Sequence, residues 1–288
     1  MARLYRTPQG ELAVRERYLE ILKRWPVENE QLKLQTREGQ TFVIASGSPK
    51  DPPLVLLHGS AFNSAMWMAD VAAWSVHFLV YAVDVIGQAG LSSPSRPAYH
   101  SDAHAEWLDD VLDALGIERA ALVGLSLGGW IALDYATRHP ERVAGLALLC
   151  PAGVGREKVS LFTLLFVVAP LLALGRWGRR LATARMLGPS PASSGAGAGE
   201  RFTSLVFAHF RPNMARVRRF SDAELARLDM PLLLVVGALD AMLDSSETRE
   251  RIERHVSRAQ VLWLAESGHR IVGQTAPILE FLRRSVRF

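Results

Sequence analysis

Short apolar runs recur along the chain, and stretches with helical periodicity or polar turns lie between them. Runs of about four to eight apolar residues are typical of strands that are buried on both faces of a sheet. The expected strands cover residues 53–57, 78–83, 120–123, 142–149, 231–236 and 260–264. Because helical stretches alternate with these strands, the pattern predicts an α/β protein whose mostly parallel sheet carries helices on both faces.

The N-terminal part of the chain precedes this alternation. Residues 9–25 predict an amphipathic helix that packs outside the core. Its expected buried positions are Leu12, Tyr18, Leu19 and Leu22. Residues 31–35 and 41–45 flank a polar turn and predict a β-hairpin. A further helix is expected over residues 63–74, where Met66 and Trp67 are core candidates.

The alternation stops between residues 154 and 226, where the sequence predicts no strand. We interpret residues 154–226 as an inserted helical cap, and residues 1–153 together with 227–288 as the core that carries it. An apolar cap above a reactive site would line an acyl-binding pocket, although a helix pair that only protects the sheet edge fits the same pattern. Within the cap we expect helices over residues 159–174, 176–187, 202–210 and 214–220, and a mobile low-complexity linker over residues 188–199.

The composition allows a sizeable core and argues against several other kinds of protein. The 288 residues are 49% hydrophobic, which excludes a wholly disordered chain, and their net charge is +4. The basic run at residues 211–219 lacks an RNA-binding motif or a zinc finger beside it, so we interpret it as the solvated face of a helix and expect no nucleic-acid partner. The single cysteine, Cys150, excludes an internal disulfide framework. It follows an apolar run, so we expect a small strand-end hydrophobe there rather than a reactive thiol.

The sequence does not predict a membrane-spanning segment. The apolar stretch at residues 161–174 contains Pro170 and is too short to span a membrane. An anchor on the membrane surface, formed by the same stretch, is an alternative. The N-terminus has no apolar region typical of a signal peptide. We therefore expect a cytoplasmic protein without a membrane span, either a monomer or a homodimer.

One motif carries specific chemistry. The stretch Gly124-Leu125-Ser126-Leu127-Gly128 is a Gly-x-Ser-x-Gly pattern between an expected strand and an expected helix. The turn is tight, and the glycines remove side chains that would collide there. It exposes Ser126 Oγ as a nucleophile and directs the backbone N–H of Leu127 toward a developing oxyanion. A glycine-rich turn with an incidental serine is the alternative.

Asp240 and His269 lie in loops that follow two later strands. A parallel sheet brings such loops to one edge, so residues that are distant along the chain become neighbours. The order serine, aspartate, histidine is the chain order of sheet hydrolases that carry this motif. We predict Ser126 as the nucleophile, His269 as the general base, and Asp240 as the acid that orients the imidazole, with Asp244 as an alternative acid.

The loop that follows the first buried strand is expected to supply a second oxyanion donor. We predict the backbone N–H of Ser60 for this role, with Ala61 as the alternative. His58 is interpreted as structural, because it lies on the wrong loop for a base. Asp84 is expected to hold its own loop by accepting backbone N–H groups. His104 is expected on a helix surface without a partner at ligand spacing, and we predict no metal site and no cofactor.

Five stretches of the chain match a known pattern: Trp25–Val27, Gly39–Gly47, Val55–Gly59, Tyr81–Gly87 and Gly124–Gly129. Through them nearly the whole chain, apart from the glycine-rich part of the cap, resembles the α/β-hydrolases and, within them, the bacterial carboxylesterase family that includes the naproxen esterase. The resemblance implies an α/β-hydrolase fold and ester hydrolysis without a cofactor, with Ser126 as nucleophile and His269 as base. The acid position of the family falls on Asp240, where the naproxen-type members carry glutamate.

We therefore predict a serine carboxylesterase that cleaves small-molecule esters with an apolar acyl part through an acyl-enzyme on Ser126. A serine nucleophile excludes the haloalkane dehalogenase and epoxide hydrolase branches of the fold, which need a carboxylate at that position. It leaves open a thioesterase, a carbon–carbon bond hydrolase, a perhydrolase, an acyltransferase, and a non-catalytic ligand-binding member of the same fold.

Overall fold

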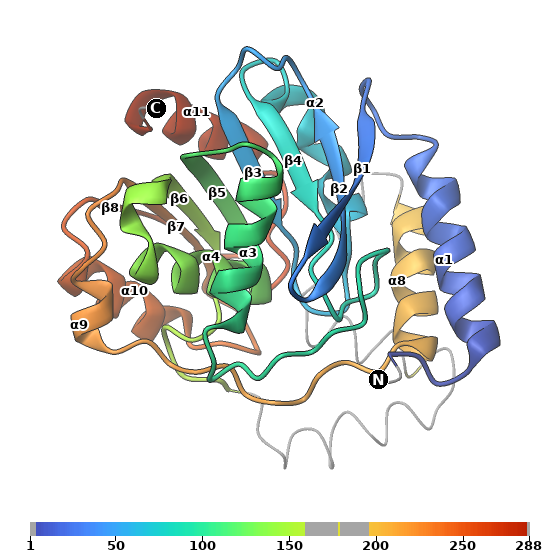
Figure 1. Ribbon diagram of the computed structural model, residues 1–288. Coiled ribbons are helices and arrows are strands. Elements are labelled where there is room, and N and C mark those ends of the chain that lie inside the picture. The colour runs from blue at the N-terminus through green and yellow to red at the C-terminus, as the bar shows by residue number, and fades with distance from the viewer. Residues whose placement is uncertain (1–3, 159–177, 179–195, 287–288) are drawn as a thin grey trace.

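The computed structural model describes residues 4–158, 178 and 196–286, and an eight-stranded sheet lies at its centre (Figure 1). The strand order is β1-β2-β4-β3-β5-β6-β7-β8. From β4 onward in this order every neighbouring pair is parallel, whereas β2 is antiparallel to both β1 and β4. The strands are β1 (Glu30–Thr36), β2 (Gly39–Ser46), β3 (Pro53–Leu57), β4 (Leu79–Val83), β5 (Ala120–Leu125), β6 (Val143–Leu149), β7 (Leu232–Gly237) and β8 (Ala259–Leu264).

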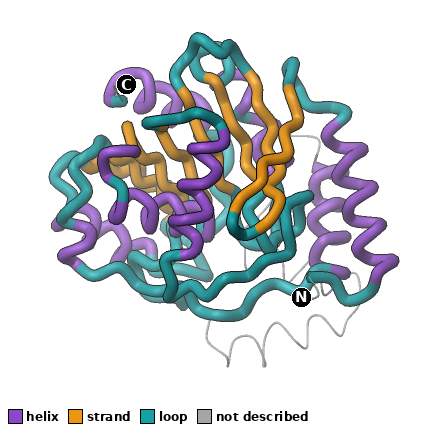
Figure 2. The backbone as a smooth tube through the Cα atoms, in the orientation of Figure 1, coloured by secondary structure: helices purple, strands orange, loops and turns teal. Residues whose placement is uncertain are grey.

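Helices cover both faces of this sheet, as Figure 2 shows in purple. One face packs against α3, α4, α9 and α10, and the other against α1, η1, α2 and α11. Two 3₁₀ helices accompany the α-helices: η1 (Ser64–Ala69) and η2 (Pro140–Arg142). The α-helices are α1 (Pro8–Leu22), α2 (Val71–Trp74), α3 (Ala103–Ala114), α4 (Leu127–Arg138), α8 (Ala196–His209), α9 (Asp222–Leu225), α10 (Ser245–His255) and α11 (Thr275–Ser285).

The strands alternate their side chains between two hydrophobic clusters. In β3, Leu54 and Leu56 belong to the cluster under α2 and α11, whereas Val55 and Leu57 belong to the cluster under α3 and α4. Successive side chains of a strand point to opposite faces, so a continuous apolar run buries both faces at once. The predicted strands are confirmed, each within about two residues at its ends, and so are the hairpin and the mostly parallel sheet with helices on both faces.

The N-terminal helix is confirmed, but part of its predicted buried face is wrong. Tyr18 and Leu22 are buried as expected, whereas Leu12 is 57% exposed and Leu19 is 44% exposed. The third buried side chain is Val14, so the face repeats every four residues. The reason is tertiary: α1 packs against α8 and η1, and α8 lies beside it in Figure 1. The helix expected over residues 63–74 is instead η1 followed by the short α2.

His104 is a second correction, because it is buried rather than on a helix surface. Its ring stacks on Tyr99 at a centroid distance of 5.2 Å and meets the edge of Trp130 at 5.3 Å. Its Nδ1 has no hydrogen-bond partner in the described structure. Burial lowers the pKa of His104 to about 4, so the ring is neutral and behaves as an aromatic core side chain.

The predicted cap helices are tested only in part. Residues 159–177 and 179–195 lie outside the described residues, so the apolar stretch and almost all of the basic stretch that follows it are not placed. The end of the predicted glycine-rich linker is helical instead, because α8 begins at Ala196. Residues 214–220 do not form the expected helix but an irregular segment that leads to α9. The basic run at residues 211–219 is therefore not the helix face that the sequence predicted. None of the helices in the described residues is long and apolar enough to cross a membrane.

Candidate active site

Ser126 occupies a strained turn between β5 and α4. Its backbone angles are φ 53° and ψ −108°, a conformation that costs a non-glycine residue about 1–3 kcal/mol. The turn is held because Ser126 N–H donates to the Leu149 carbonyl oxygen at 2.9 Å. Glycines on either side are obligatory: a Cβ on Gly124 would collide with the Gly128 carbonyl, and one on Gly128 would collide with the Leu57 carbonyl. The sequence motif thus marks a turn that only glycine can flank.

His269 bridges Ser126 and Asp240. Its Nε2 lies 3.0 Å from Ser126 Oγ, and its Nδ1 lies 2.7 Å from Asp240 Oδ2. His269 is 4% exposed and Asp240 is 3% exposed. The second carboxylate oxygen of Asp240 accepts the backbone N–H groups of Met242 at 2.7 Å and Leu243 at 3.0 Å. The structure therefore brings three predicted residues into one hydrogen-bonded series.

The charge state of Asp240 decides the tautomer of His269. Burial raises the pKa of the Asp240 carboxyl, but the hydrogen bond and charge of His269 and the N–H groups of Leu243 and Met242 together hold that pKa below its usual value. An ionised carboxylate only accepts hydrogen bonds, so we assign the proton of the neutral imidazole to Nδ1. Nε2 is then free to accept the hydroxyl proton of Ser126.

The loops that carry Asp240 and His269 are joined to each other. Ala238 N–H donates to the Leu264 carbonyl at 2.9 Å, and Leu239 N–H donates to the Ser267 carbonyl at 2.9 Å. The approach is so close that a Cβ on Gly237 would collide with the Ser267 carbonyl. The β7 and β8 loops therefore form one unit, which keeps the aspartate and the histidine in register.

The alternative acid, Asp244, has another role in the structure. Its side chain is at the N-cap of α10, where Oδ1 accepts the Glu247 N–H at 3.1 Å. This is a typical use of aspartate at a helix start. The carboxylate that meets His269 belongs to Asp240.

The two predicted oxyanion donors, Ser60 and Leu127, belong to segments that adjoin the turn at Ser126. Gly59, at the end of β3, passes so close that its Cβ, if present, would be 3.6 Å from Ser126 Cβ. Ser60 follows it directly, and Leu127 is the first residue of α4. Neither the Ser60 N–H nor the Leu127 N–H donates to any group in the part of the chain that the structure describes.

Ala61, the alternative donor, is already engaged. Its N–H donates to Gln88 Oε1 at 2.9 Å, and its φ of 60° is rare for alanine. Gln88 is 4% exposed, so its amide is a buried anchor for this loop. Nothing in the sequence singles out Gln88, because a glutamine in a glycine-rich loop has no spacing or motif that distinguishes it.

His58 and Asp84 hold the loops that follow β3 and β4 through buried hydrogen bonds. His58 is fully buried; its Nδ1 contacts the Gly59 carbonyl at 2.9 Å, and its Nε2 accepts the Val85 N–H at 2.9 Å. Burial lowers the pKa of His58 despite the opposing charge of Asp84, so the ring stays neutral and links two loops. Asp84 accepts backbone N–H groups of Ser64 and Leu91, each at 2.8 Å. The structural interpretation of both residues agrees with these contacts.

Cys150 lies beside the carboxylate and imidazole. Its sulfur, an oxygen of Asp240 and a ring nitrogen of His269 all lie within 4.8 Å of one another. Burial raises the pKa of the Cys150 thiol, and the charge of Asp240 raises it further, so the sulfur remains protonated. Two of these three groups already bond to each other, because His269 Nδ1 lies 2.7 Å from Asp240 Oδ2. Cys150 is 2% exposed, in keeping with the expected strand-end hydrophobe.

Comparison with known proteins places this arrangement in a family. Residues 52–173 match the family model described as the alpha/beta hydrolase fold. The crystal structure of carboxylesterase CesB (YbfK) from Bacillus subtilis is 32% identical, with a TM-score of 0.79 over 96% of this chain and 96% of that one. The chain belongs to the α/β-hydrolase family. The crystal structure of naproxen esterase from Bacillus subtilis is similar to this α/β-hydrolase at 30% identity and a TM-score of 0.80, over 96% of this chain and 97% of that one.

A curated protein sequence from Bacillus subtilis is also similar to this chain. The uncharacterized carboxylesterase nap of Bacillus subtilis (strain 168) is 47% identical over 135 residues. This alignment covers 47% of our α/β-hydrolase and 45% of the relative, so the chain spans about half the length of the curated relatives it matches.

Proposed function

We propose that this α/β-hydrolase is a serine carboxylesterase, with Ser126 as nucleophile, His269 as general base and Asp240 as the acid of the triad. The observation that carries the proposal is the hydrogen-bonded series from Ser126 Oγ through His269 to Asp240, at 3.0 Å and 2.7 Å. The similarity to bacterial carboxylesterases of known structure supports ester substrates in particular.

Acylation follows from the positions of these atoms. His269 Nε2 takes the hydroxyl proton as Ser126 Oγ attacks the carbonyl carbon of the ester. The negative charge that develops on the carbonyl oxygen is stabilised by the N–H groups of Ser60 and Leu127 and by the positive end of α4. His269 then gives its proton to the leaving alcohol, which leaves the acyl group on Ser126. Water activated by the same imidazole releases the acid.

Asp240 makes this proton transfer efficient. Its carboxylate holds the Nδ1–H tautomer of His269 and stabilises the imidazolium that forms during attack. Because Met242 and Leu243 saturate its other oxygen, the carboxylate cannot rotate away from the ring. Ser126, His269 and Asp240 are therefore arranged for proton transfer before a substrate binds.

An apolar acyl group is the proposed substrate part. Ala61 and Ala89, which lie in the loops beside Ser60, pack with Val206 of α8 and with Phe210. This apolar cluster adjoins the proposed oxyanion donors, and it supports an acyl pocket formed between the core, residues 1–153 and 227–288, and a cap, residues 154–226. We also propose that the protein acts in the cytoplasm as a monomer or homodimer.

Hydrolysis of short p-nitrophenyl esters tests this function. We expect turnover by the wild type, and loss of turnover with retained folding in Ser126→Ala. A fluorophosphonate should label Ser126 in the wild type only. A folded wild type with neither turnover nor labelling would favour a non-catalytic ligand-binding member. Faster cleavage of thioesters or of carbon–carbon bonds in the same assay would redirect the proposal to those hydrolases.

A further inference from the structure

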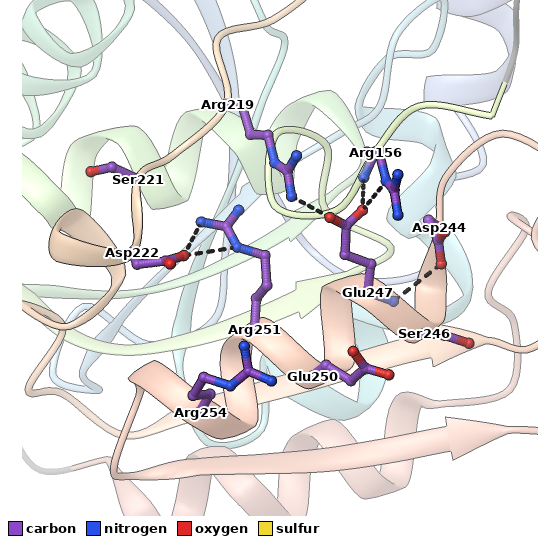
Figure 3. A pocket seen from close by; sticks show the side chains of 10 residues that line it. All are labelled: Arg156, Arg219, Ser221, Asp222, Asp244, Ser246, Glu247, Glu250, Arg251 and Arg254. Atoms are coloured by element: carbon purple, nitrogen blue, oxygen red, sulfur yellow. Dashed lines mark hydrogen bonds and ion pairs between the residues drawn. The ribbon is translucent and has the colours of Figure 1, made fainter.

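The two ends of the proposed cap meet at one face of α10. Residues 153–158 lead out of the core after β6, and residues 218–222 lead back before α9. Glu247 and Arg251 lie one turn apart on α10 (Figure 3). Each contacts both ends. We call this pair the α10 clamp.

The Glu247 carboxylate binds the backbone and side chain of Arg156 in the outgoing end, and the side chain of Arg219 in the returning end. Its Oε2 accepts the Arg156 backbone N–H at 2.7 Å and the Arg156 Nε at 3.1 Å. Its Oε1 pairs with the guanidinium of Arg219. One carboxylate thus joins two segments that are more than sixty positions apart along the chain.

Arg251, which is positively charged, also bonds to both ends of the proposed cap. Its guanidinium donates to the carbonyl oxygen of Val154 in the outgoing end and, at 2.8 Å, to that of Phe220 in the returning end. It also pairs with Asp222. Figure 3 shows the Arg251 side chain reaching from α10 toward Asp222.

The clamp is connected to the loop that carries Asp240. The Arg156 carbonyl oxygen accepts the Asp244 N–H at 2.8 Å, and Asp244 Oδ1 accepts the Glu247 N–H at 3.1 Å. Glu247, Arg156 and Asp244 therefore close a ring of hydrogen bonds. Two residues further on, the Lys158 N–H donates to the Met242 carbonyl at 2.7 Å.

These contacts set the shape of the loop from Asp240 to Asp244. The carboxylate of Asp240 depends on the N–H groups of Met242 and Leu243. The carbonyl of that same Met242 is held by Lys158, and Lys158 Nζ also donates to the Asp240 carbonyl at 3.2 Å. Residues 153–158, the outgoing end, therefore fix the backbone of the loop from Asp240 to Asp244, which we call the acid loop. The clamp in turn holds the outgoing end in place.

The charged partners of the clamp are open to water, whereas the two clamp side chains are largely covered. The clamp borders a cavity of about 630 Å³ whose lining includes both clamp residues and their arginine and aspartate partners. The side chains of Arg156 and Asp222 are 72% and 60% exposed, whereas those of Glu247 and Arg251 are 20% and 12% exposed. Exposed ion pairs contribute little to stability because water and salt screen them. What the clamp supplies is the placement of backbone groups.

We propose that Glu247 and Arg251 are positioning residues for the triad, which act by holding the outgoing end against the acid loop so that Asp240 meets His269. This inference rests on the proposed esterase function. It predicts that removing the Glu247 carboxylate lowers the rate of the chemical step and leaves substrate binding nearly unchanged. Stability should change little, because the two arginine partners of Glu247 are exposed.

Glu247→Ala is the decisive variant, and Glu253→Ala is its matched control. Glu253 is on the same helix and pairs with Arg249 at 2.8 Å, so the control removes an ion pair of the same kind away from the acid loop. With a short p-nitrophenyl ester we expect kcat to fall roughly tenfold in Glu247→Ala, with KM within about twofold. Glu253→Ala should keep the wild-type kcat, and the melting temperatures of the two variants should be similar.

A double-mutant cycle with Asp240→Asn separates positioning from general disruption. If Glu247 acts through Asp240, Glu247→Ala should cause little further loss once Asp240 is an asparagine. An equal loss in both backgrounds, or a wild-type kcat in Glu247→Ala, overturns the inference. If Glu247→Ala does not fold, Glu247→Gln carries the same comparison, since its oxygen can still accept one bond. An inactive wild type would instead contradict the proposed function itself.

Discussion

Tyr18 Oη donates a hydrogen bond to Asp84 Oδ1 at 2.9 Å, which ties α1 to the loop after β4 across 66 positions of the chain. Burial raises the pKa of Tyr18 well above its usual value, and the charge of Asp84 adds to the rise. The hydroxyl therefore remains a donor to the carboxylate. Asp84 also orders Ser64 and Leu91, so the N-terminal helix is part of the support beneath the proposed oxyanion loop.

Tyr18→Phe should destabilise the protein by about 1–3 kcal/mol, because a buried bond to a charged acceptor is lost while the ring is kept. Urea unfolding measures this free energy. Leu19→Ala is the control on the same helix, since Leu19 is 44% exposed and its truncation should cost under about 0.5 kcal/mol. Equal losses in the two variants would mean that the contact with Asp84 contributes nothing.

Asp240→Asn should lower kcat for ester hydrolysis by roughly 10³–10⁴-fold, because an amide stabilises the wrong tautomer of His269 and cannot stabilise the imidazolium. Asp244→Asn should stay within about threefold of the wild type, since asparagine also serves as an N-cap. Steady-state kinetics on a p-nitrophenyl ester compares them. The reverse order of the two losses would assign the acid to Asp244.

Ser60 should act through its backbone, so its side chain is expendable and its N–H is not. Ser60→Ala should keep kcat within about threefold, whereas Ser60→Pro should lower kcat by about 10²–10³-fold because it removes one oxyanion donor. Circular dichroism and thermal melting check that the proline variant is folded. A large loss in Ser60→Ala would show instead that the hydroxyl takes part.

His104 should make the protein sensitive to mild acid. The pKa of this buried ring is about 4 in the folded state, below its usual value near 6.5, so the unfolded chain binds more protons between these two pH values. Stability should therefore fall as the pH drops from about 6.5 toward 4. His104→Phe keeps the contacts with Tyr99 and Trp130 but cannot take up a proton.

Thermal melting from pH 7 to pH 4 tests this prediction. The decline in melting temperature should be shallower in His104→Phe than in the wild type, with the two proteins similar at pH 7. Parallel curves would show that other groups are responsible for the acid sensitivity.

Local pattern was enough to predict the strands, the elbow around Ser126 and the order of the three site residues. Each strand is a run of apolar residues that a doubly covered sheet requires, and Gly124 and Gly128 are needed because the turn leaves no room for a Cβ. These are properties of consecutive residues. The meeting of Ser126, Asp240 and His269 also follows from sequence, since a parallel sheet gathers its loops at one edge.

Only the tertiary structure decided which faces of the helices are buried and which polar groups meet. Leu12 and Leu19 are exposed because α8 packs against another side of α1, and His104 is buried by Tyr99 and Trp130. The engagement of Ala61 by Gln88 and the bridging of both cap ends by Glu247 join residues far apart in the chain. No periodicity encodes such partners, because hydrogen bonds and ion pairs depend on the three-dimensional position of single atoms.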